Sequence, residues 1–571
     1  MEYTQTQETV GKLEETACHQ RQANLPADPS RRSFLGKAGA AIAMAASAIT
    51  LEPGMGGEHS VARANEIGPL DDQARANASF YLREELAEKQ HNLPLVSHPC
   101  NNDEDLYPDK CASYSKALPH DAFARVDLNA YRSYINALTS GRPSDFESII
   151  LGGTRKLTNP QSGLAFDTEG TDSHNLTVPA APTVDCSQTA AEMVEQYWAS
   201  LLRDVPFAQY PLNTTALTAA AELNLLSGYM GPRPVTPLNL FRGVFPGETD
   251  GPYVSQFMLQ PTRFGNQPIT QRFVPFLPNV DYMTTFADFL TVQNGGSTGL
   301  EPREDPTPRY LRNGRDFSAW TRVDVLYQGY FVAFLVLAGI GAPLNPGNPY
   351  IRSRTQIGFG TLGGPDFAAT LAEVATRALK AVWFQKWFVH RRTRPEAIGG
   401  IVHLIKTGLG MTTSCKLSND VLNSQAVQQS FNRYGSYLLS QAFPEGSPTH
   451  PSYPSGHATV GGACITVLKF FFDGNFVIPN PVMPSDDGLS LLPYVGLPLT
   501  VNGELNKLGH NVTFGHGIHP GIHYRSDSTE ALRLGEAVAL SVLQDKAQTY
   551  NEKFTVTLTK FDGTTAVISN E

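Results

Sequence analysis

Residues 450–472, HPSYPSGHATVGGACITVLKFFF, pass from a turn rich in proline and serine into an apolar run. The order of these residues predicts a helix that begins at Gly456 and continues to the end of the stretch. The Ser455 hydroxyl, the glycine amide and the His457 imidazole would then lie at a helix N-terminus, where backbone N–H groups bind anions. Because glycine has no side chain, the backbone could approach the anion closely. This segment therefore predicts an oxyanion site at the start of a helix.

Cationic side chains gather in a second segment, residues 386–400, KWFVHRRTRPEAIGG. It ends a long helix that we expect over residues 367–391. Lys386 and Arg394 are eight positions apart, so they would share a face if the helix persisted until Pro395 stopped it. The cluster could instead serve only to complement the negative end of the helix dipole.

A third segment, residues 521–536, GIHYRSDSTEALRLGE, places His523 and Asp527 four positions apart. The carboxylate could hold one imidazole nitrogen and leave the other as a ligand or a nucleophile. Asp527 could also act as a helix cap, and the two roles are compatible.

The remaining patterns are mostly helical. Val323 opens a strongly apolar stretch up to residue 341, but Asp324 and Gln328 lie within it, so we expect burial or a dimer contact rather than a membrane span. The last residues alternate around Asp562-Gly563, which predicts a β-hairpin. Further helices are expected over residues 190–202 and 528–543, and an ordered loop over 242–315. The predicted class is mainly α with long ordered loops and minor β.

Composition limits the kinds of partner. Of 571 residues, 41% are hydrophobic and 17% are charged, which excludes general disorder. The formal net charge is −10, so a nucleic-acid partner is not expected. A local pocket can still be positive within an acidic protein, and small anions stay possible ligands.

The N-terminus has the features of an export signal. Residues 30–37, SRRSFLGK, contain a twin arginine, and the weakly hydrophobic run over 38–51 is too short to cross a bilayer. Residues 62–64, ARA, form a cleavage site, so we expect residues 1–64 to be a twin-arginine signal peptide. The mature chain would begin at Asn65 and be periplasmic or secreted. The alternative is an amphipathic N-terminal helix.

An oxidising compartment would allow a disulfide between two of the cysteines. Six cysteines occur, and Cys18 would leave with the signal. Cys100 and Cys111 flank a polar loop, NNDEDLYPDK, and we expect a local disulfide between them.

Together the three segments resemble the vanadium-dependent haloperoxidases, which share a fold with type 2 phosphatidic-acid phosphatases and bacterial acid phosphatases. The spacing K-x7-R-P and the phrases HPSYPSGHA and GIHYRSD are similar to the algal and cyanobacterial bromoperoxidase branch. The resemblance covers roughly residues 70–557 and includes NPQSGLAFDTEG (159–170), VEQYWASLLRDVPF (194–207), FRGVFPGETDGPYVSQF (241–257) and EVATRALKAVWFQKW (373–387). It implies a haloperoxidase-like helical bundle over residues 65–571, with an N-terminal part to about 320 and a catalytic helical part from about 321.

The resemblance also implies a cofactor, vanadate. In this family a histidine coordinates vanadium axially, and His523 holds that position here. Charge-assisted hydrogen bonds would hold the vanadate oxygens, from Lys386, Arg394, Ser455 and the Gly456 amide.

Other residues are matched to the reaction rather than to holding the cofactor. His457 matches the acid–base histidine, and His450 matches a second histidine typical of bromoperoxidases. Lys386 would also act in catalysis by polarising the peroxide. Trp383 lies at a position where family members carry Trp or Arg, so the halide preference is mixed and leans to bromide. Asp527 would orient His523.

One position departs from the family pattern. The family carries an arginine six residues before the axial histidine, and here that place is Gly517. His516 or His519 could fill it, although an imidazole offers no bidentate fork. Alternatively these histidines are only part of a loop, and the pocket binds vanadate weakly or not at all.

The implied activity is oxidation of bromide, with iodide or chloride as further candidates, by hydrogen peroxide. The product, hypohalous acid, would halogenate small organic molecules. The alternatives are a phosphatase that uses the same pocket with His523 as nucleophile, and an inactive relative. We expect no membrane span and a homodimer or higher homo-oligomer.

Overall fold

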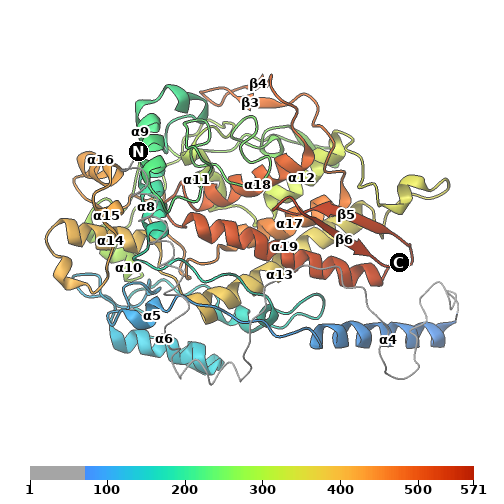
Figure 1. Cartoon of the computed structure of the whole chain (residues 1–571), viewed down its shortest axis with the longest axis horizontal. Helices are drawn as coiled ribbons and strands as arrows, with labels where there is room; N and C mark the ends of the chain where they lie inside the picture. The colour runs from blue at the N-terminus through green and yellow to red at the C-terminus, as the bar shows by residue number, and fades with distance from the viewer. Residues whose placement is uncertain (1–70) are drawn as a thin grey trace, which may run out of the picture.

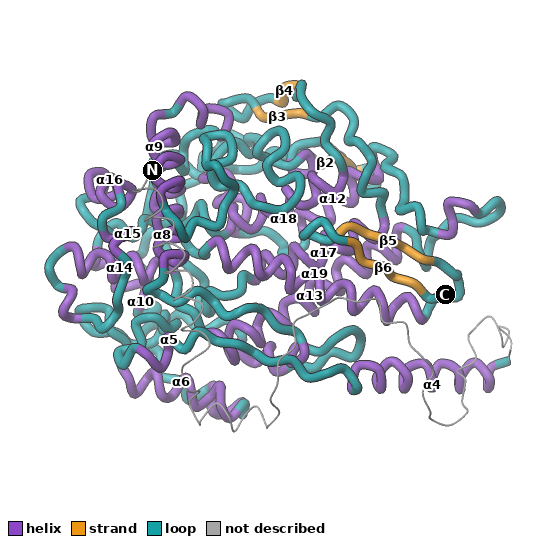
Figure 2. The backbone as a smooth tube through the Cα atoms, viewed as in Figure 1, coloured by secondary structure: helices purple, strands orange, loops and turns teal. Residues whose placement is uncertain are grey.

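Two long helices, α17 (Gly456–Phe471) and α19 (Arg525–Gln548), pack against each other at the centre of the molecule, with α13 (Gly364–Phe384) packed on both (Figure 1 and Figure 2). These coordinates are a computed structural model, and they describe residues 71–571. The expected signal peptide lies outside the described residues. The division near residue 320 stays a prediction.

Glycine lets the two central helices approach each other closely. A Cβ atom at Gly462 of α17 would lie 2.0 Å from the carbonyl oxygen of Leu532. A Cβ atom at Gly535 of α19 would lie 1.9 Å from the carbonyl oxygen of Thr459. The small residues of the sequence therefore decide where the helices cross, and every residue of α17 except His457 is buried.

The other elements surround this pair. The first half of the described chain carries α4 (Asp72–His91), α5 (Asp103–Leu106), α6 (Leu128–Ser140), α7 (Pro143–Phe146), α8 (Ser187–Leu201), α9 (Thr214–Leu225), β1 (Thr262–Phe264), β2 (Gln267–Ile269), α10 (Phe286–Gln293) and α11 (Gly314–Arg322). The second half adds α12 (Gln328–Gly339), α14 (Pro395–Lys406), α15 (Asn419–Leu422), α16 (Gln425–Tyr434), β3 (Val482–Pro484), β4 (Leu491–Pro493), α18 (Val501–His516), β5 (Thr555–Thr559) and β6 (Thr565–Ser569).

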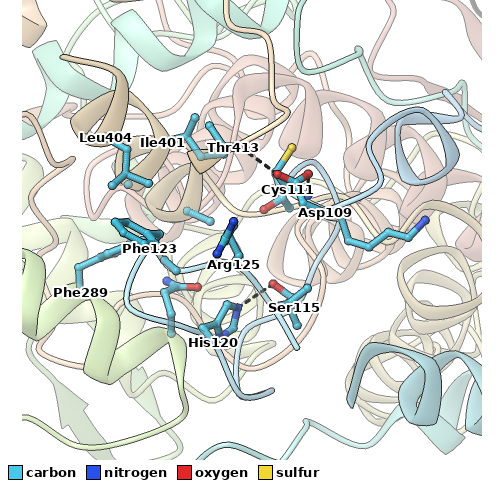
Figure 3. A pocket seen from close by; sticks show the side chains of 17 residues that line it. Asp109, Cys111, Ser115, His120, Phe123, Arg125, Phe289, Ile401, Leu404 and Thr413 are labelled. Atoms are coloured by element: carbon cyan, nitrogen blue, oxygen red, sulfur yellow. Dashed lines mark hydrogen bonds between the residues drawn. The ribbon is translucent and has the colours of Figure 1, made fainter. Parts of the chain in front are cut away.

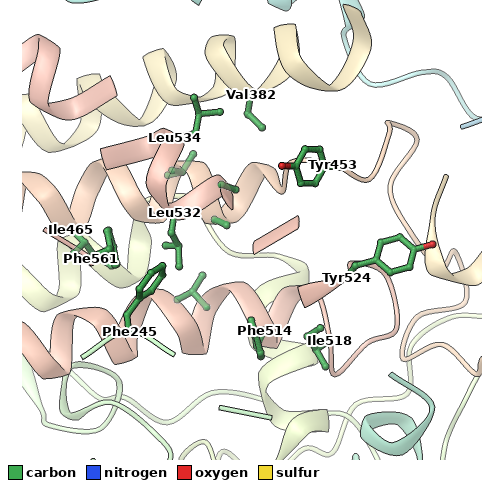
Figure 4. Close-up of a cluster of buried hydrophobic side chains, with 14 of the residues drawn as sticks. Phe245, Val382, Tyr453, Ile465, Phe514, Ile518, Tyr524, Leu532, Leu534 and Phe561 are labelled. Atoms are coloured by element: carbon green, nitrogen blue, oxygen red, sulfur yellow. The ribbon is translucent and has the colours of Figure 1, made fainter. Parts of the chain in front are cut away.

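Apolar side chains fill the space between α17, α18 and α19 (Figure 4). Ile465 of α17 and Leu532 of α19 both belong to this cluster. Phe561 is fully buried, and its ring centroid lies 5.3 Å from that of Phe245. The C-terminal hairpin is thereby anchored to the core.

The predicted fold class is confirmed. β5 and β6 form the expected antiparallel hairpin, with Thr555 opposite Ser569 and Gly563 at a φ of 83° in the turn. The expectation of a loop over 242–315 is wrong in part, because this stretch contains the β1–β2 hairpin and α10. Thr285 caps α10 by accepting from the N–H of Asp288, a local start signal that the prediction overlooked.

Two further expectations concern the apolar helix and the cysteines. α12 buries Tyr330 and Leu337, and none of the helices within residues 71–571 is long and apolar enough to span a membrane. The structure does not contain the predicted disulfide between Cys100 and Cys111, because both side chains are thiols in it. The Cys100 Sγ lies 3.3 Å from Asn102 Oδ1 and donates to it, so this thiol is directed into its own turn.

Candidate active site

Lys386 and Arg394 reach one point from two different backbone elements. α13 continues beyond Phe384 as a π-helical turn over Gln385–His390, and this turn carries Lys386. The chain leaves the turn at Arg391, whose φ of 45° lies in the left-handed region. Arg394 follows as the N-cap residue of α14.

Lys386 and Arg394 would have shared a helix face only if one helix persisted to Pro395, and this condition is not met. Proline fits the first position of a helix, where its missing N–H would have had no partner anyway. Pro395 accordingly begins α14 instead of ending α13. The π turn and the change of direction bring Lys386 and Arg394 together. The sequence suggested that they meet, but on one face of a single helix.

The Arg394 guanidinium lies at the centre of the site and is 2% exposed. Its Nε donates to the carbonyl oxygen of His450 (3.0 Å), and its Nη1 donates to that of Ile522 (2.9 Å). Nη1 also lies 2.9 Å from His523 Nε2, and Nη2 lies 2.9 Å from His450 Nδ1. Because arginine only donates, both imidazole nitrogens act as acceptors.

The Lys386 ammonium binds the same 450–452 turn as this guanidinium, and the Arg394 charge acts on it. Its Nζ donates to the carbonyl oxygens of Pro451 (2.7 Å) and Ser452 (2.8 Å), and the residue is fully buried. Its partners are thus neutral carbonyls rather than carboxylates.

Asp527 fixes the orientation of His523. The His523 Nδ1 lies 2.8 Å from Asp527 Oδ2 and donates to it, so the lone pair is on Nε2. Arg392 Nη1 donates to the other carboxylate oxygen at 2.9 Å. The same carboxylate accepts the N–H of Tyr524 (3.1 Å) at the start of α19. Orientation and capping, the two roles considered for Asp527, are therefore combined.

Ser455 and Gly456 form the N-terminus of α17. Ser455 is the N-cap residue, but its hydroxyl makes no capping bond and is buried without a hydrogen-bond partner among the described residues. A Cβ atom at Gly456 would lie 3.1 Å from the Trp383 ring, so the indole covers this helix end. The Trp383 and His450 ring centroids are 4.8 Å apart. Trp383 Nε1 donates to the Thr158 carbonyl at 2.9 Å.

His457 is held by two partners that are distant in the chain. Its Nε2 lies 3.0 Å from Oδ1 of Asp324, which precedes α12. Its ring stacks on His516, with centroids 3.6 Å apart and an interplanar angle of 20°. The His516 ring centroid is 5.9 Å from that of His523. His516 therefore lies between the acid–base candidate and the axial-ligand candidate.

The two candidates for the missing arginine occupy different environments. His516 contacts the site, and its Nδ1 is buried without a partner among the described residues. His519 lies 3.2 Å from the Tyr253 hydroxyl through Nε2 and stacks on Phe317 in a separate aromatic cluster. Gly517 cannot carry a side chain, because a Cβ there would lie 2.9 Å from that of His523.

The electrostatics of the site favour an anion. Burial lowers the pKa of Lys386 well below its usual value, and the Arg394 charge lowers it further. Burial also lowers the pKa of Arg394 to about 10. For His516 and His523, burial lowers the pKa well below 6.5, so both imidazoles are neutral. Two desolvated cations with neutral partners gain most from an oxyanion between them.

The residues present fit a tetrahedral oxyanion such as vanadate. Two cations, a helix N-terminus with an unpartnered serine hydroxyl, and an imidazole lone pair converge on one buried place. Helix N-termini and charge-assisted donors are the groups that bind such anions in proteins.

Comparison with known proteins decides the family. The model of the VCPO second helical-bundle domain matches residues 367–552. The vanadium-dependent bromoperoxidase of Ascophyllum nodosum is 36% identical over 519 residues, which cover 86% of this chain and 91% of that protein. The chain belongs to the vanadium-dependent haloperoxidases.

Other members of the family agree. The vanadium-dependent bromoperoxidase of Corallina pilulifera is 34% identical, over 88% of this haloperoxidase and 100% of that protein. The homohexameric structure of the second vanadate-dependent bromoperoxidase from Ascophyllum nodosum superposes with a TM-score of 0.83 at 29% identity, and covers 91% of this chain and 94% of that one.

Sequence reasoning missed two residues of this haloperoxidase site. Asp324 was noted only as a polar residue in an apolar stretch. A buried carboxylate needs a partner, so its presence there was a signal that could have been used. Arg392 was counted in the cationic cluster without a role. It lies between Asp527 and Glu192, with Nη2 3.4 Å from the Glu192 carboxylate.

Proposed function

We propose that this haloperoxidase is a vanadate-dependent bromoperoxidase that oxidises bromide with hydrogen peroxide to hypobromous acid, which then halogenates small organic molecules. The observation that carries the proposal is the buried set of Lys386, Arg394 and Ser455 around the lone pair of His523 Nε2. The named relatives at 34–36% identity support bromide as the halide.

In this proposal, His523 Nε2 would bind vanadium, and Asp527 keeps that nitrogen unprotonated by accepting from Nδ1. Lys386, Arg394, the Ser455 hydroxyl and the Gly456 amide bind the vanadate oxygens. Bound vanadate supplies a Lewis-acidic vanadium(V) centre that activates hydrogen peroxide without changing its own oxidation state. Arg394 Nη1 lies 2.9 Å from His523 Nε2, so the guanidinium that would hold an oxyanion oxygen is next to the nitrogen that would bind the metal.

His457 moves the proton in the proposed reaction. Its Nε2–H donates to Asp324, which leaves Nδ1 to accept a proton from the incoming hydrogen peroxide and to return it later. His450 holds Arg394 through its carbonyl oxygen and Nδ1. Trp383 covers His450 and the start of α17, and so limits the space open to halide.

The proposal also covers the oligomeric state of the protein and its location. α4 projects from the body of the protein (Figure 1), it has no buried residue, and Phe80 is 61% exposed on it. Most of the stability of a protein helix comes from packing of one face, and α4 buries no residue in this protomer, which supports a homo-oligomer in which it packs on another copy. The homohexameric relative supports the same proposal. We also propose export by the twin-arginine route, which N-terminal sequencing of the secreted protein would test.

The test is bromination of monochlorodimedone by the purified protein with hydrogen peroxide and bromide, before and after orthovanadate is added. We expect activity that vanadate restores and that inorganic phosphate inhibits by competition. A folded protein that stays inactive at saturating vanadate would overturn the proposal. Hydrolysis of p-nitrophenyl phosphate without peroxide would instead identify the phosphatase, with His523 as nucleophile.

A further inference from the structure

The loop that follows α5 is clamped to the segment between α14 and α15. The Asp109 carboxylate accepts from the N–H of Ser414 at 2.7 Å. It also accepts from the Thr413 hydroxyl at 3.3 Å (Figure 3). The Cys111 Sγ lies 3.9 Å from the Ser414 hydroxyl. These bonds place two segments that are far apart in the sequence side by side.

The clamp also brings two thiols together. Cys415 directly follows Ser414, whose hydroxyl lies 3.9 Å from Cys111 Sγ, and the neighbouring Cys111 thiol is the main cause that raises the pKa of Cys415. Cys111 is partly exposed, whereas Cys415 is buried. A small oxidant can therefore reach one sulfur first, while the other is protected next to it.

The same loop supports the active site. Residues 112–114 run beside residues 391–393, with Tyr114 N–H donating to the Arg391 carbonyl (2.8 Å) and Thr393 N–H donating to the Ala112 carbonyl (3.3 Å). Arg394, the central guanidinium of the site, follows directly. A covalent link at Cys111 would thus hold the backbone that positions this arginine.

We propose that Cys111 and Cys415 form a disulfide when the protein meets hydrogen peroxide, and that this link holds the 112–114 segment against the Arg391–Arg394 turn. The partner of Cys111 is then Cys415, not Cys100. The disulfide closes a long loop of the chain, so it stabilises the folded state by restricting the unfolded one.

The reaction balances with hydrogen peroxide alone. The Cys111 sulfur attacks one peroxide oxygen, the O–O bond breaks, and the products are a sulfenic acid and one water. The Cys415 sulfur then gives up its proton and attacks the Cys111 sulfur, which releases a second water. Two thiols lose two electrons and two protons, and peroxide takes up both. Neither vanadate nor halide takes part, so the outcome is independent of the proposed activity.

The experiment uses the full chain, purified under reducing conditions and treated with hydrogen peroxide without bromide or vanadate. Thiols are counted in denaturant, and unreduced peptides are mapped by mass spectrometry. We expect a peptide linked through Cys111 and Cys415, and a higher unfolding temperature for the oxidised protein. Cys415→Ser should abolish both effects, whereas Cys100→Ser, the matched control, should leave both unchanged.

Three results would overturn the inference. One is a peptide that links Cys100 to Cys111. Another is conversion of Cys111 to sulfinic acid in the wild-type protein with no linked peptide. The last is an unfolding temperature that rises equally on oxidation of the Cys415→Ser variant.

Discussion

The imidazole rings of His457 and His516 stack face to face, with their centroids 3.6 Å apart. Burial, and then the neighbouring His457, keep the pKa of His516 well below 6.5, so this ring is neutral. It therefore offers the site one nitrogen and a flat surface where an arginine would offer a charged fork. This arrangement leads to the first two predictions.

Replacement of His516 by phenylalanine retains the stacked ring and removes its nitrogens. We expect the vanadate dissociation constant to rise roughly 2- to 10-fold, because a typical hydrogen bond contributes about 0.5–1.5 kcal/mol. Equilibrium dialysis with vanadate measures this without turnover. His519→Phe is the control, since His519 lies in another cluster, and it should leave vanadate affinity unchanged. Equal affinity in wild type and His516→Phe would contradict the role given to His516.

Asp324→Asn removes the carboxylate that accepts from His457. The imidazole loses its fixed orientation, and general acid–base catalysis weakens, so we expect the bromination kcat to fall roughly 10- to 100-fold. Vanadate affinity should hardly change, because Asp324 bonds to His457 rather than to a group proposed to hold the anion. Steady-state kinetics and a vanadate titration on the same preparation separate the two effects. A fall in affinity with unchanged kcat would contradict this assignment.

The buried ion cluster of Asp281, Arg203 and Arg315 makes the free energy of unfolding depend on pH in the acid range. Burial would raise the pKa of Asp281, but Arg203 and Arg315 outweigh it and lower the pKa to about 2. Because the folded pKa lies below the unfolded value of about 3.9, the carboxylate stabilises the fold above that value. This stability is lost as the pH falls from about 4 to 2, and amounts to about 2.6 kcal/mol.

Urea unfolding at several pH values checks this prediction. In Asp281→Asn the acid-dependent part of the unfolding free energy should shrink by about that amount. Arg203 Nε also donates to the carbonyl oxygen of His519 (2.8 Å), so the cluster supports the loop between α18 and α19. An identical pH slope in both proteins would show that Asp281 does not contribute.

The crossing of α17 and α19 should tolerate no side chain at Gly535. In Gly535→Ala the new Cβ would lie 1.9 Å from the Thr459 carbonyl oxygen, and we expect a loss of about 3 kcal/mol or more. Gly364→Ala, at the start of α13, meets nothing within 4 Å and should change stability by less than about 0.5 kcal/mol. Thermal unfolding of the two variants beside wild type gives the comparison. Similar unfolding temperatures for both would argue against the close helix contact.

The sequence predicted those parts of the site that depend on neighbours along the chain. Ser455, Gly456 and His457 follow from the start of a single helix, and His523 with Asp527 follows from a spacing of four residues. Such distances are fixed by local backbone geometry, whatever the rest of the fold does. The C-terminal hairpin was predictable for the same reason.

Only the tertiary structure decided which distant groups meet. It brought Asp324 to His457, stacked His516 rather than His519 on that ring, and placed Cys111 beside the segment that carries Cys415. None of these pairs is related by a helical or strand period, and each depends on how the core packs around α17. The sequence by itself therefore determined the chemical groups of the anion site and its helix start, whereas packing decided which partners orient those groups.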